Sequence, residues 1–139
     1  MTEPSEPAVT RTASRVAAEQ RTTEIQDRVV AALPDGAVAD ERTIDWTLLA
    51  CSETEVSAAG GVAITLAREI DVDATYEAIT AAVQDDGYTA ATDTTRKGAK
   101  RLTVTGVDDD QYLVTIYNDT KKIRLSSFSQ CFPGSLNDD

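Results

Sequence analysis

The chain has 139 residues and a mass of 14.9 kDa, enough for one domain with an ordinary core. Its 13 basic and 24 acidic residues give a net charge of −11, which argues against binding to nucleic acid or to an anionic membrane. It has no histidine, so the usual general base and the commonest metal ligand are missing. No stretch approaches the roughly 20 apolar residues that a transmembrane segment needs.

The two ends of the sequence are polar and are not expected to belong to the fold. Residues 1–9 are rich in Pro, Glu, Ser and Thr, which is typical of a disordered linker. Residues 135–139 form an acidic tail, so we expect a single domain over residues 10–134. No signal peptide is recognisable, and we expect any export signal or lipid anchor to lie upstream of Met1. If Met1 is the natural start, a cytoplasmic location is expected instead.

The first half of the domain is predicted to form one helix and two strands. Residues 10–33 carry apolar side chains at helical spacing, and Pro34 and Gly36 end the helix. Residues 44–52 and 62–70 alternate between apolar and polar side chains, as half-buried strands do. Gly60 and Gly61 are interpreted as a break between these strands. The apolar sets are Val16, Ile25, Val29 and Leu33 in the helix, and Ile44, Trp46, Leu48 and Ala50 on one face of the first strand.

The second half is predicted to form a helix and four strands. Residues 73–86 form the clearest helix, with Asp73 as its N-cap and an apolar stripe of Tyr76, Ile79 and Val83. Strands are expected at residues 88–94, 102–106, 112–118 and 123–128, with short connections that indicate an antiparallel meander. The order is therefore α-β-β-α-β-β-β-β. We expect a two-layer α+β fold, an antiparallel β-sheet with helices packed on one face.

The residues that could carry chemistry do not form a catalytic or metal-binding pattern. The sequence lacks a G-x-S-x-G or S-x-x-K motif for a serine nucleophile. The acidic run at residues 108–110 lacks the spacing of a calcium loop, so we interpret these residues as solvated turn residues. Trp46 is interpreted as a core residue, and the four tyrosines as core or sheet-face residues. We expect neither an enzyme nor a cofactor or metal site.

Arg96, Lys97, Lys100 and Arg101 form a local concentration of positive charge. Four cations within six residues could hold an anionic group or the acidic patch of a partner. They could equally be solvated residues of a hairpin, where charge protects an edge strand from aggregation. No aromatic residue is interleaved with them, which argues further against nucleic acid.

Cys51 and Cys131 lie 80 positions apart, and each is near the end of a predicted strand. In an exported protein an even number of cysteines suggests a disulfide. In a cytosolic protein two buried, reduced cysteines are expected instead, because cysteine is among the most buried residue types. A catalytic thiol and a zinc site are both disfavoured, because there is no CxxC and no histidine.

Several short motifs resemble one group of proteins. They are Leu33-Pro34-Asp35-Gly36, Trp46 five positions before Cys51, Asp86-Gly87-Tyr88 after the second helix, and the late segment SSFSQCFP that contains Cys131. Together they resemble the small secreted or lipid-anchored cell-envelope domains of actinobacteria, many of which have no assigned function. The resemblance covers roughly residues 25–133. It implies export, a disulfide between Cys51 and Cys131 and a helix-on-sheet fold, but no activity.

Two functions from different classes are compatible with these features. The first is a non-catalytic, exported cell-envelope domain that binds a protein partner or ligand or scaffolds an assembly. The second is an acidic cytoplasmic protein of the inhibitor or immunity type, because a strongly negative surface steers a basic partner. The resemblance favours the first, and with it an extracellular or cell-envelope location.

Overall fold

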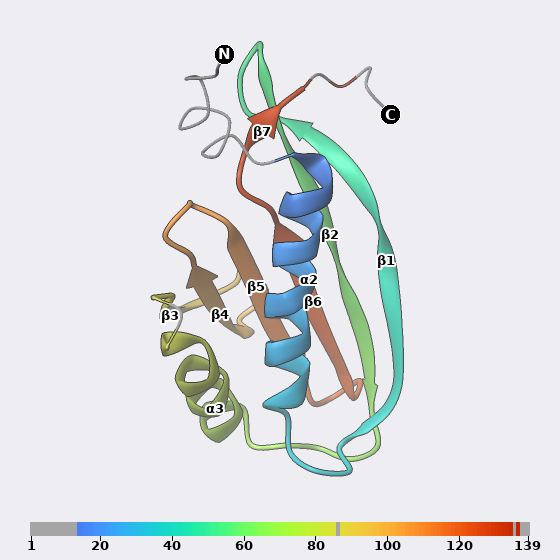
Figure 1. The fold of residues 1–139 in the computed structure, drawn as a ribbon. Helices are drawn as coiled ribbons and strands as arrows, with labels where there is room; N and C mark the ends of the chain where they lie inside the picture. Colours follow the sequence, from blue (N-terminus) through green and yellow to red (C-terminus); the bar gives the residue numbers. More distant parts are fainter. Residues whose placement is uncertain (1–13, 86, 135, 137–139) are drawn as a thin grey trace.

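The computed structural model describes residues 14–85, 87–134 and 136. The expected linker, residues 10–13 of the expected first helix, and all of the expected tail except Leu136 lie outside the described residues. The described chain forms two helices and one seven-stranded antiparallel sheet (Figure 1). The predicted α+β class and the predicted order of elements are confirmed, and one short strand is added at the C-terminal end.

The elements alternate along the chain as expected, but their order in the sheet does not follow the sequence. Helix α2 spans Arg15–Ala31 and helix α3 spans Val72–Gln84. The strands are β1 (Val38–Ala50), β2 (Glu55–Leu66), β3 (Thr89–Thr94), β4 (Lys100–Thr105), β5 (Gln111–Tyr117), β6 (Lys122–Phe128) and β7 (Phe132–Pro133). Across the sheet the order is β1-β2-β6-β5-β4-β3, and β7 pairs with the first residues of β2.

Both helices cover the same face of the sheet (Figure 1). Helix α2 lies along β2 and β6, and α3 lies over β3 and β4. The predicted stripe of α3 is confirmed, because Tyr76, Ile79 and Val83 are all buried. No helix in the described part of the chain covers the opposite face, which we call the open face.

The buried stripe of α2 differs from the prediction at its beginning. Ser14 caps the helix by accepting a hydrogen bond from the N–H of Ala17 at 3.1 Å. Ile25 and Val29 are buried as expected, but Val16 is 63% exposed. Nine residues separate Val16 from Ile25, and at about 100° per residue they lie on opposite sides of the helix. Ala18 and Thr22 occupy the buried side instead.

The cap of α3 is Asp71 and not the predicted Asp73. The Asp71 carboxylate accepts a 2.9 Å hydrogen bond from the N–H of Ala74. Asp73 already lies in the first turn, where an acidic side chain is favourable because of the helix dipole. The sequence did not distinguish the two positions, because Asp71 and Asp73 have the same side chain and either could cap the helix.

The first two strands are longer than predicted, and the glycine pair does not separate them. β1 begins at Val38, and β2 runs through Gly60 and Gly61 without a break. A Cβ on Gly60 would lie 2.8 Å from Cε3 of Trp46, and one on Gly61 would collide with the carbonyl oxygen of Leu125. The two glycines therefore allow close packing inside a strand, which is the other common role of strand glycine.

A register shift in β1 changes which face its apolar residues occupy. Ile44 pairs with Gly61 and Leu48 pairs with Ala58, with the irregularity between Ile44 and Thr47. Ile44 is consequently on the open face, whereas Trp46 and Leu48 pack on the helix side. The prediction that all of them share one face was wrong, because one extra residue reverses the alternation.

Candidate functional site

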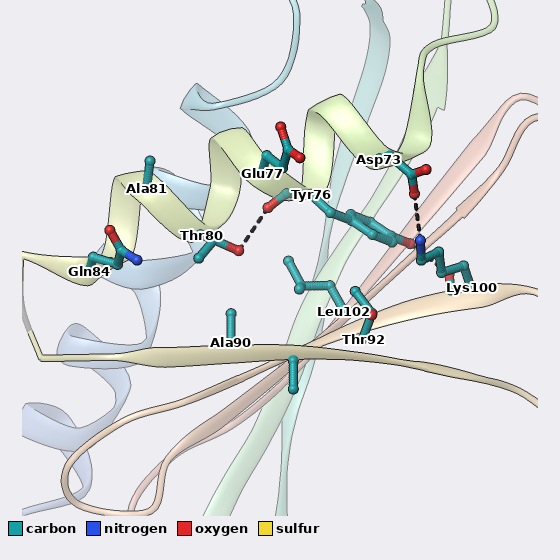
Figure 2. Close-up of a pocket in the computed structure, with 11 residues that line it drawn as sticks. Asp73, Tyr76, Glu77, Thr80, Ala81, Gln84, Ala90, Thr92, Lys100 and Leu102 are labelled. Carbon is teal, nitrogen blue, oxygen red and sulfur yellow. Dashed lines mark hydrogen bonds and ion pairs between the residues drawn. The ribbon is translucent and has the colours of Figure 1, made fainter.

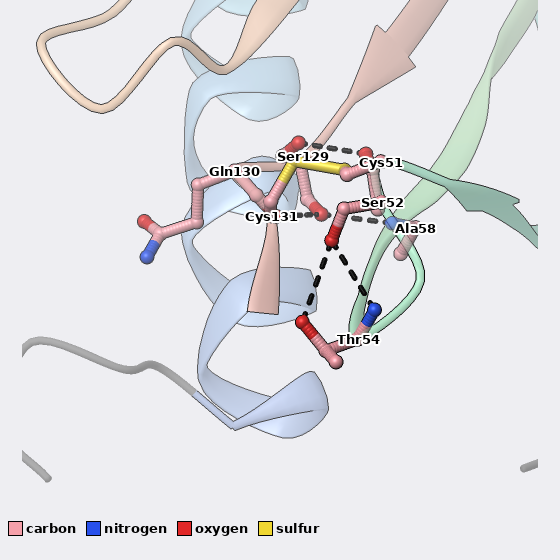
Figure 3. Close-up of a disulfide and its surroundings, with 8 residues drawn as sticks. Cys51, Ser52, Thr54, Ala58, Ser129, Gln130 and Cys131 are labelled. Carbon is pink, nitrogen blue, oxygen red and sulfur yellow. Dashed lines mark hydrogen bonds between the residues drawn. A yellow bond between two sulfur atoms is a disulfide. The ribbon is translucent and has the colours of Figure 1, made fainter. Parts of the chain in front are cut away.

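The disulfide end of the sheet is closed by Cys51 and Cys131, whose Cα atoms are 6.4 Å apart (Figure 3). The bond predicted from the resemblance is thus present. Next to it, Ser129 joins the segment before Cys131 to β2: its hydroxyl accepts from the N–H of Ala58 at 2.9 Å, and its carbonyl accepts from Ser57 at 2.7 Å. Both cysteines are exposed to solvent.

The two cysteines are not brought together by direct pairing of the strands that precede them. β1 and β6 are not neighbours, because β2 lies between them. The chain after β6 continues along β2, where Phe132 pairs with Val56, and this brings Cys131 to the end of β1. The cross-link therefore joins two segments that are both paired to β2.

The four predicted cations of the basic run do not form one patch. Arg96 and Lys97 lie in the turn between β3 and β4, and both are exposed. Lys100 lies on the helix side, where its Nζ is 2.6 Å from the Asp73 carboxylate. Arg101 is paired with Asp93 of β3, with its Nη2 2.6 Å from the carboxylate. The four cations are therefore divided among the β3–β4 turn, the helix side of β4 and the opposite side of β4.

The ion pair of Arg101 and Asp93 links two neighbouring strands. A second hydrogen bond of 3.1 Å from Arg101 Nε makes the contact bidentate. These hydrogen bonds lower the pKa of the Asp93 carboxyl and raise the pKa of the Arg101 guanidinium. Because both groups are exposed, we assign the pair a small part in stability.

A groove of about 600 Å³ lies between helix α3 and the edge strand β3 (Figure 2). Ala90 and Thr92 of β3 point toward the helix and Thr80 of α3 lies opposite them, whereas Ala81 lies at the rim with its methyl group directed away from β3. Leu102 of β4 is buried at its base. The alanines and threonines in its lining are small and leave space for another chain segment.

Tyr76 and Lys100 form one end of this groove. The Tyr76 hydroxyl donates to the carbonyl oxygen of Lys100 at 2.7 Å and accepts from the N–H of Ile116 at 3.1 Å. Burial of the ring raises the Tyr76 pKa to about 12, so this hydroxyl stays protonated at neutral pH. Glu77 lies on the rim and makes no ion pair with any described residue.

The other notable polar cluster is buried and is not open to a ligand. The hydroxyls of Tyr88 and Tyr112 both donate to Oδ2 of Asp110 at 2.7 Å, and Arg21 Nε donates to the Tyr88 hydroxyl at 3.2 Å. Asp110 is only 3% exposed, so its prediction as a solvated turn residue was wrong. A side chain at Gly106 would collide with the Asp110 carboxylate, which explains why glycine stands there.

The tyrosines of this cluster are unusually weak acids. Burial, followed by the hydrogen bond to Asp110 and its negative charge, raises the pKa of Tyr88 to about 12. The same causes raise the pKa of Tyr112 further. Neither hydroxyl can act as a base near neutral pH, and the Asp110 oxygen that they share is occupied. The cluster therefore stabilises the packing of α2 on the sheet.

Sequence reasoning did not identify the residues of a second groove, which lies on the open face beside β1, β2 and β6. Arg42, Lys122 and Arg124 line it, and its volume is about 650 Å³. The alternation in β6 showed which of its residues point away from the core. It placed Lys122 and Arg124 on one face, but it did not show that β6 lies beside β2, so Arg42 could not be grouped with them from the sequence.

The described residues contain no group of three or more His, Cys, Asp or Glu side chains arranged to hold a metal ion. Within the same residues, neither helix is long and apolar enough to cross a membrane.

Comparison with known proteins adds no relative. No protein-family model matches the chain, and no curated protein or solved structure shows significant similarity to it. The function must therefore be inferred from the geometry of the two grooves and from the disulfide.

Proposed function

We propose that this chain is a non-catalytic, exported cell-envelope domain that binds an extended, basic segment of a partner protein between α3 and β3. The observation that carries the proposal is the groove of about 600 Å³ directly beside a free edge strand. An extended segment can add to a sheet edge by main-chain hydrogen bonds while its side chains enter a neighbouring groove.

The disulfide supports the proposal that the protein functions in an oxidising compartment. Disulfides persist in secreted and envelope proteins and are rare in the cytosol, where glutathione and thioredoxin keep thiols reduced. Cys51 and Cys131 are both exposed, so reductants would reach their bond directly.

The two edges of the sheet differ in their suitability for strand addition. In an antiparallel edge strand every second residue directs its N–H and C=O away from its neighbour, and within the described part of the chain β3 pairs only with β4. Its side chains are mostly Thr and Ala, and its single charge, Asp93, is paired with Arg101. β1 carries Asp40, Glu41 and Arg42 in succession and has two register shifts, both of which hinder pairing. The β3 edge is therefore the one that accepts a segment.

The groove also indicates the composition of that segment. Alanine and threonine side chains leave space for small apolar side chains of a partner. Glu77 on the rim is free to pair with a lysine or an arginine, and the net charge of −11 attracts a basic segment in general.

A non-catalytic role is supported by the state of the side chains that could act as a nucleophile or a base. There is no histidine, and both cysteines are consumed in the disulfide. Among the described residues, Asp110 is the one deeply buried carboxylate, and it accepts hydrogen bonds from two tyrosines. A binding role requires none of these groups to react.

Selection of random displayed peptides on the oxidised protein tests the binding site. Enriched peptides should be extended and basic, and their addition should slow hydrogen exchange of the β3 amides. Ala90→Leu fills the groove and should abolish binding, whereas Ala78→Leu, on the exposed side of α3, should not. Glu77→Gln should weaken binding more than Glu69→Gln, an exposed carboxylate outside the groove. Peptides that bind Ala90→Leu normally would contradict the site.

Export is tested separately by alkylating thiols in intact cells of the source organism. Protection of both cysteines is expected. Two free thiols would favour the cytoplasmic inhibitor or immunity-type protein instead, without affecting the peptide measurement.

A further inference from the structure

The open face of the sheet brings two arginines to either side of an alanine. Arg42 of β1 pairs with Ala63 of β2, and Ala63 pairs in turn with Arg124 of β6. Residues paired across neighbouring strands point to the same face. Since strands are about 4.8 Å apart, the two arginine Cα atoms lie roughly 9–10 Å from each other, with only a methyl group between them.

The next row of the sheet adds a third cation. Thr65 pairs with Lys122, and the Lys122 ammonium donates to the Thr65 hydroxyl at 3.3 Å. Asp40 is the single carboxylate that lines the groove, so cations outnumber it three to one. This is a local excess of positive charge on a protein whose net charge is −11.

The side chains of the two arginines make no polar contact within the described part of the fold. Arg42 and Arg124 are exposed, and neither forms a hydrogen bond or an ion pair with a described residue. Arg101 lies in the same row, next to Thr115, but its guanidinium is engaged by Asp93. Arginine provides five donors in a planar fork that fits the oxygens of an oxyanion.

We propose that this groove binds the phosphate or sulfate group of a soluble small molecule. A tetrahedral dianion over Ala63 has enough oxygens to accept from both guanidinium forks and from Lys122. A carboxylate has only two oxygens and one charge, so it would leave part of the cation set unsatisfied. Ile44 and Tyr117 border the groove and offer apolar surface to the rest of the molecule.

The charge distribution argues against larger anionic partners. Three cations and one carboxylate match a single dianionic group, whereas a polyanion or an anionic membrane would also meet the net charge of −11 that the chain carries as a whole. The site is on the face opposite α3, so it is independent of the proposed peptide groove, and either can fail without the other.

Calorimetric titration with phenyl phosphate, a soluble phosphomonoester, tests the proposal. Arg42→Gln and Arg124→Gln should each weaken binding by about tenfold or more, as expected for the loss of a charge-assisted hydrogen bond. Lys97→Gln removes the same charge from the exposed β3–β4 turn and should leave the affinity unchanged. Ala63→Leu keeps every charge but fills the floor of the groove, and should also abolish binding.

Two further measurements separate the sources of the anion. Phenyl phosphate loses its second proton at pH ~6, so its affinity should rise as the pH is raised through this value. The affinity for phenyl sulfate should stay constant over the same pH range. Vesicles that contain phosphatidylglycerol should not bind. Equal losses in Lys97→Gln and Arg42→Gln, or unchanged binding by Ala63→Leu, would overturn the proposed site. Binding to the vesicles but not to phenyl phosphate would overturn a soluble ligand.

Discussion

Ser127 of β6 donates a 2.6 Å hydrogen bond to the side-chain oxygen of Gln26 in α2, although the two residues are 101 positions apart in the chain. Both side chains are buried, Gln26 at 4% and Ser127 at 0% exposure. The bond therefore connects the first helix to the centre of the sheet in a place that water does not reach.

We expect Ser127→Ala to lower the free energy of unfolding by about 1–3 kcal/mol, because it leaves the buried Gln26 oxygen without its donor. Adding Gln26→Leu removes the second polar group, so the double variant should lose less than the sum of the single losses. Urea denaturation measures all three variants. Ser126→Ala, on the open face, is the control and should change stability by less than about 0.5 kcal/mol. Additive losses would show that the two side chains are not coupled.

Ile79 is the best probe of how α3 rests on the sheet. It is completely buried, so Ile79→Ala should cost roughly 2–5 kcal/mol through lost burial and a residual cavity. Val107→Ala, at a residue that is 73% exposed, should have almost no effect. A loss of only a few tenths of a kcal/mol at Ile79 in denaturant unfolding would mean that α3 does not cover the sheet as described.

The buried tyrosines predict a loss of stability at high pH. Their folded-state pKa is raised, to about 12 for Tyr88 and Tyr76, above an unfolded value of 10.0, so the folded state holds their protons more tightly. This contribution is fully present below about pH 10 and is lost as the pH rises toward 12. Tyrosinate absorbance and denaturation between pH 9 and pH 12 measure both effects.

Asp110 is one cause of the raised pKa of Tyr88, which allows a matched test. Asp110→Asn keeps the shape but removes the charge, and should therefore move the tyrosinate transition to lower pH. Asp109→Asn changes an adjacent exposed carboxylate and should leave the transition in place. An equal response of the two variants would indicate a general charge effect and not the local hydrogen bonds.

Reduction of the disulfide should destabilise the whole domain. Cys51 and Cys131 are 80 positions apart, and closing so long a loop contributes roughly 4 kcal/mol in the chain-entropy model. Urea midpoints with and without reductant, and for the double variant Cys51→Ser with Cys131→Ser, measure this loss. If only the β7 segment were released, hydrogen exchange would increase there while the midpoint of unfolding stayed the same.

The local parts of the fold were predictable because apolar periodicity reports which face of an element is buried. Helix α3 and strands β4, β5 and β6 have strong alternation or a clear stripe, and the structure has them within a few residues of the prediction. β1 was predicted too short because its first residues, such as Glu41 and Arg42, are exposed on both faces of an edge strand and show no alternation. Asp110 was misjudged because one of its two tyrosine donors, Tyr88, is 22 positions away in the chain, although the other, Tyr112, follows it by two.

By itself, the sequence determined the element order, the α+β class and the buried side of α3, all of which depend on neighbours within a few residues. Only the tertiary structure decided that β6 lies between β2 and β5, and this single choice places Arg124 beside Ala63 and Arg42. The packing of α3 on β3 and β4 likewise brings Lys100 to Asp73 at the end of the α3 groove. Strand order depends on long-range pairing, and every exposed strand position looks alike in the sequence, so both grooves exist only once the sheet has assembled.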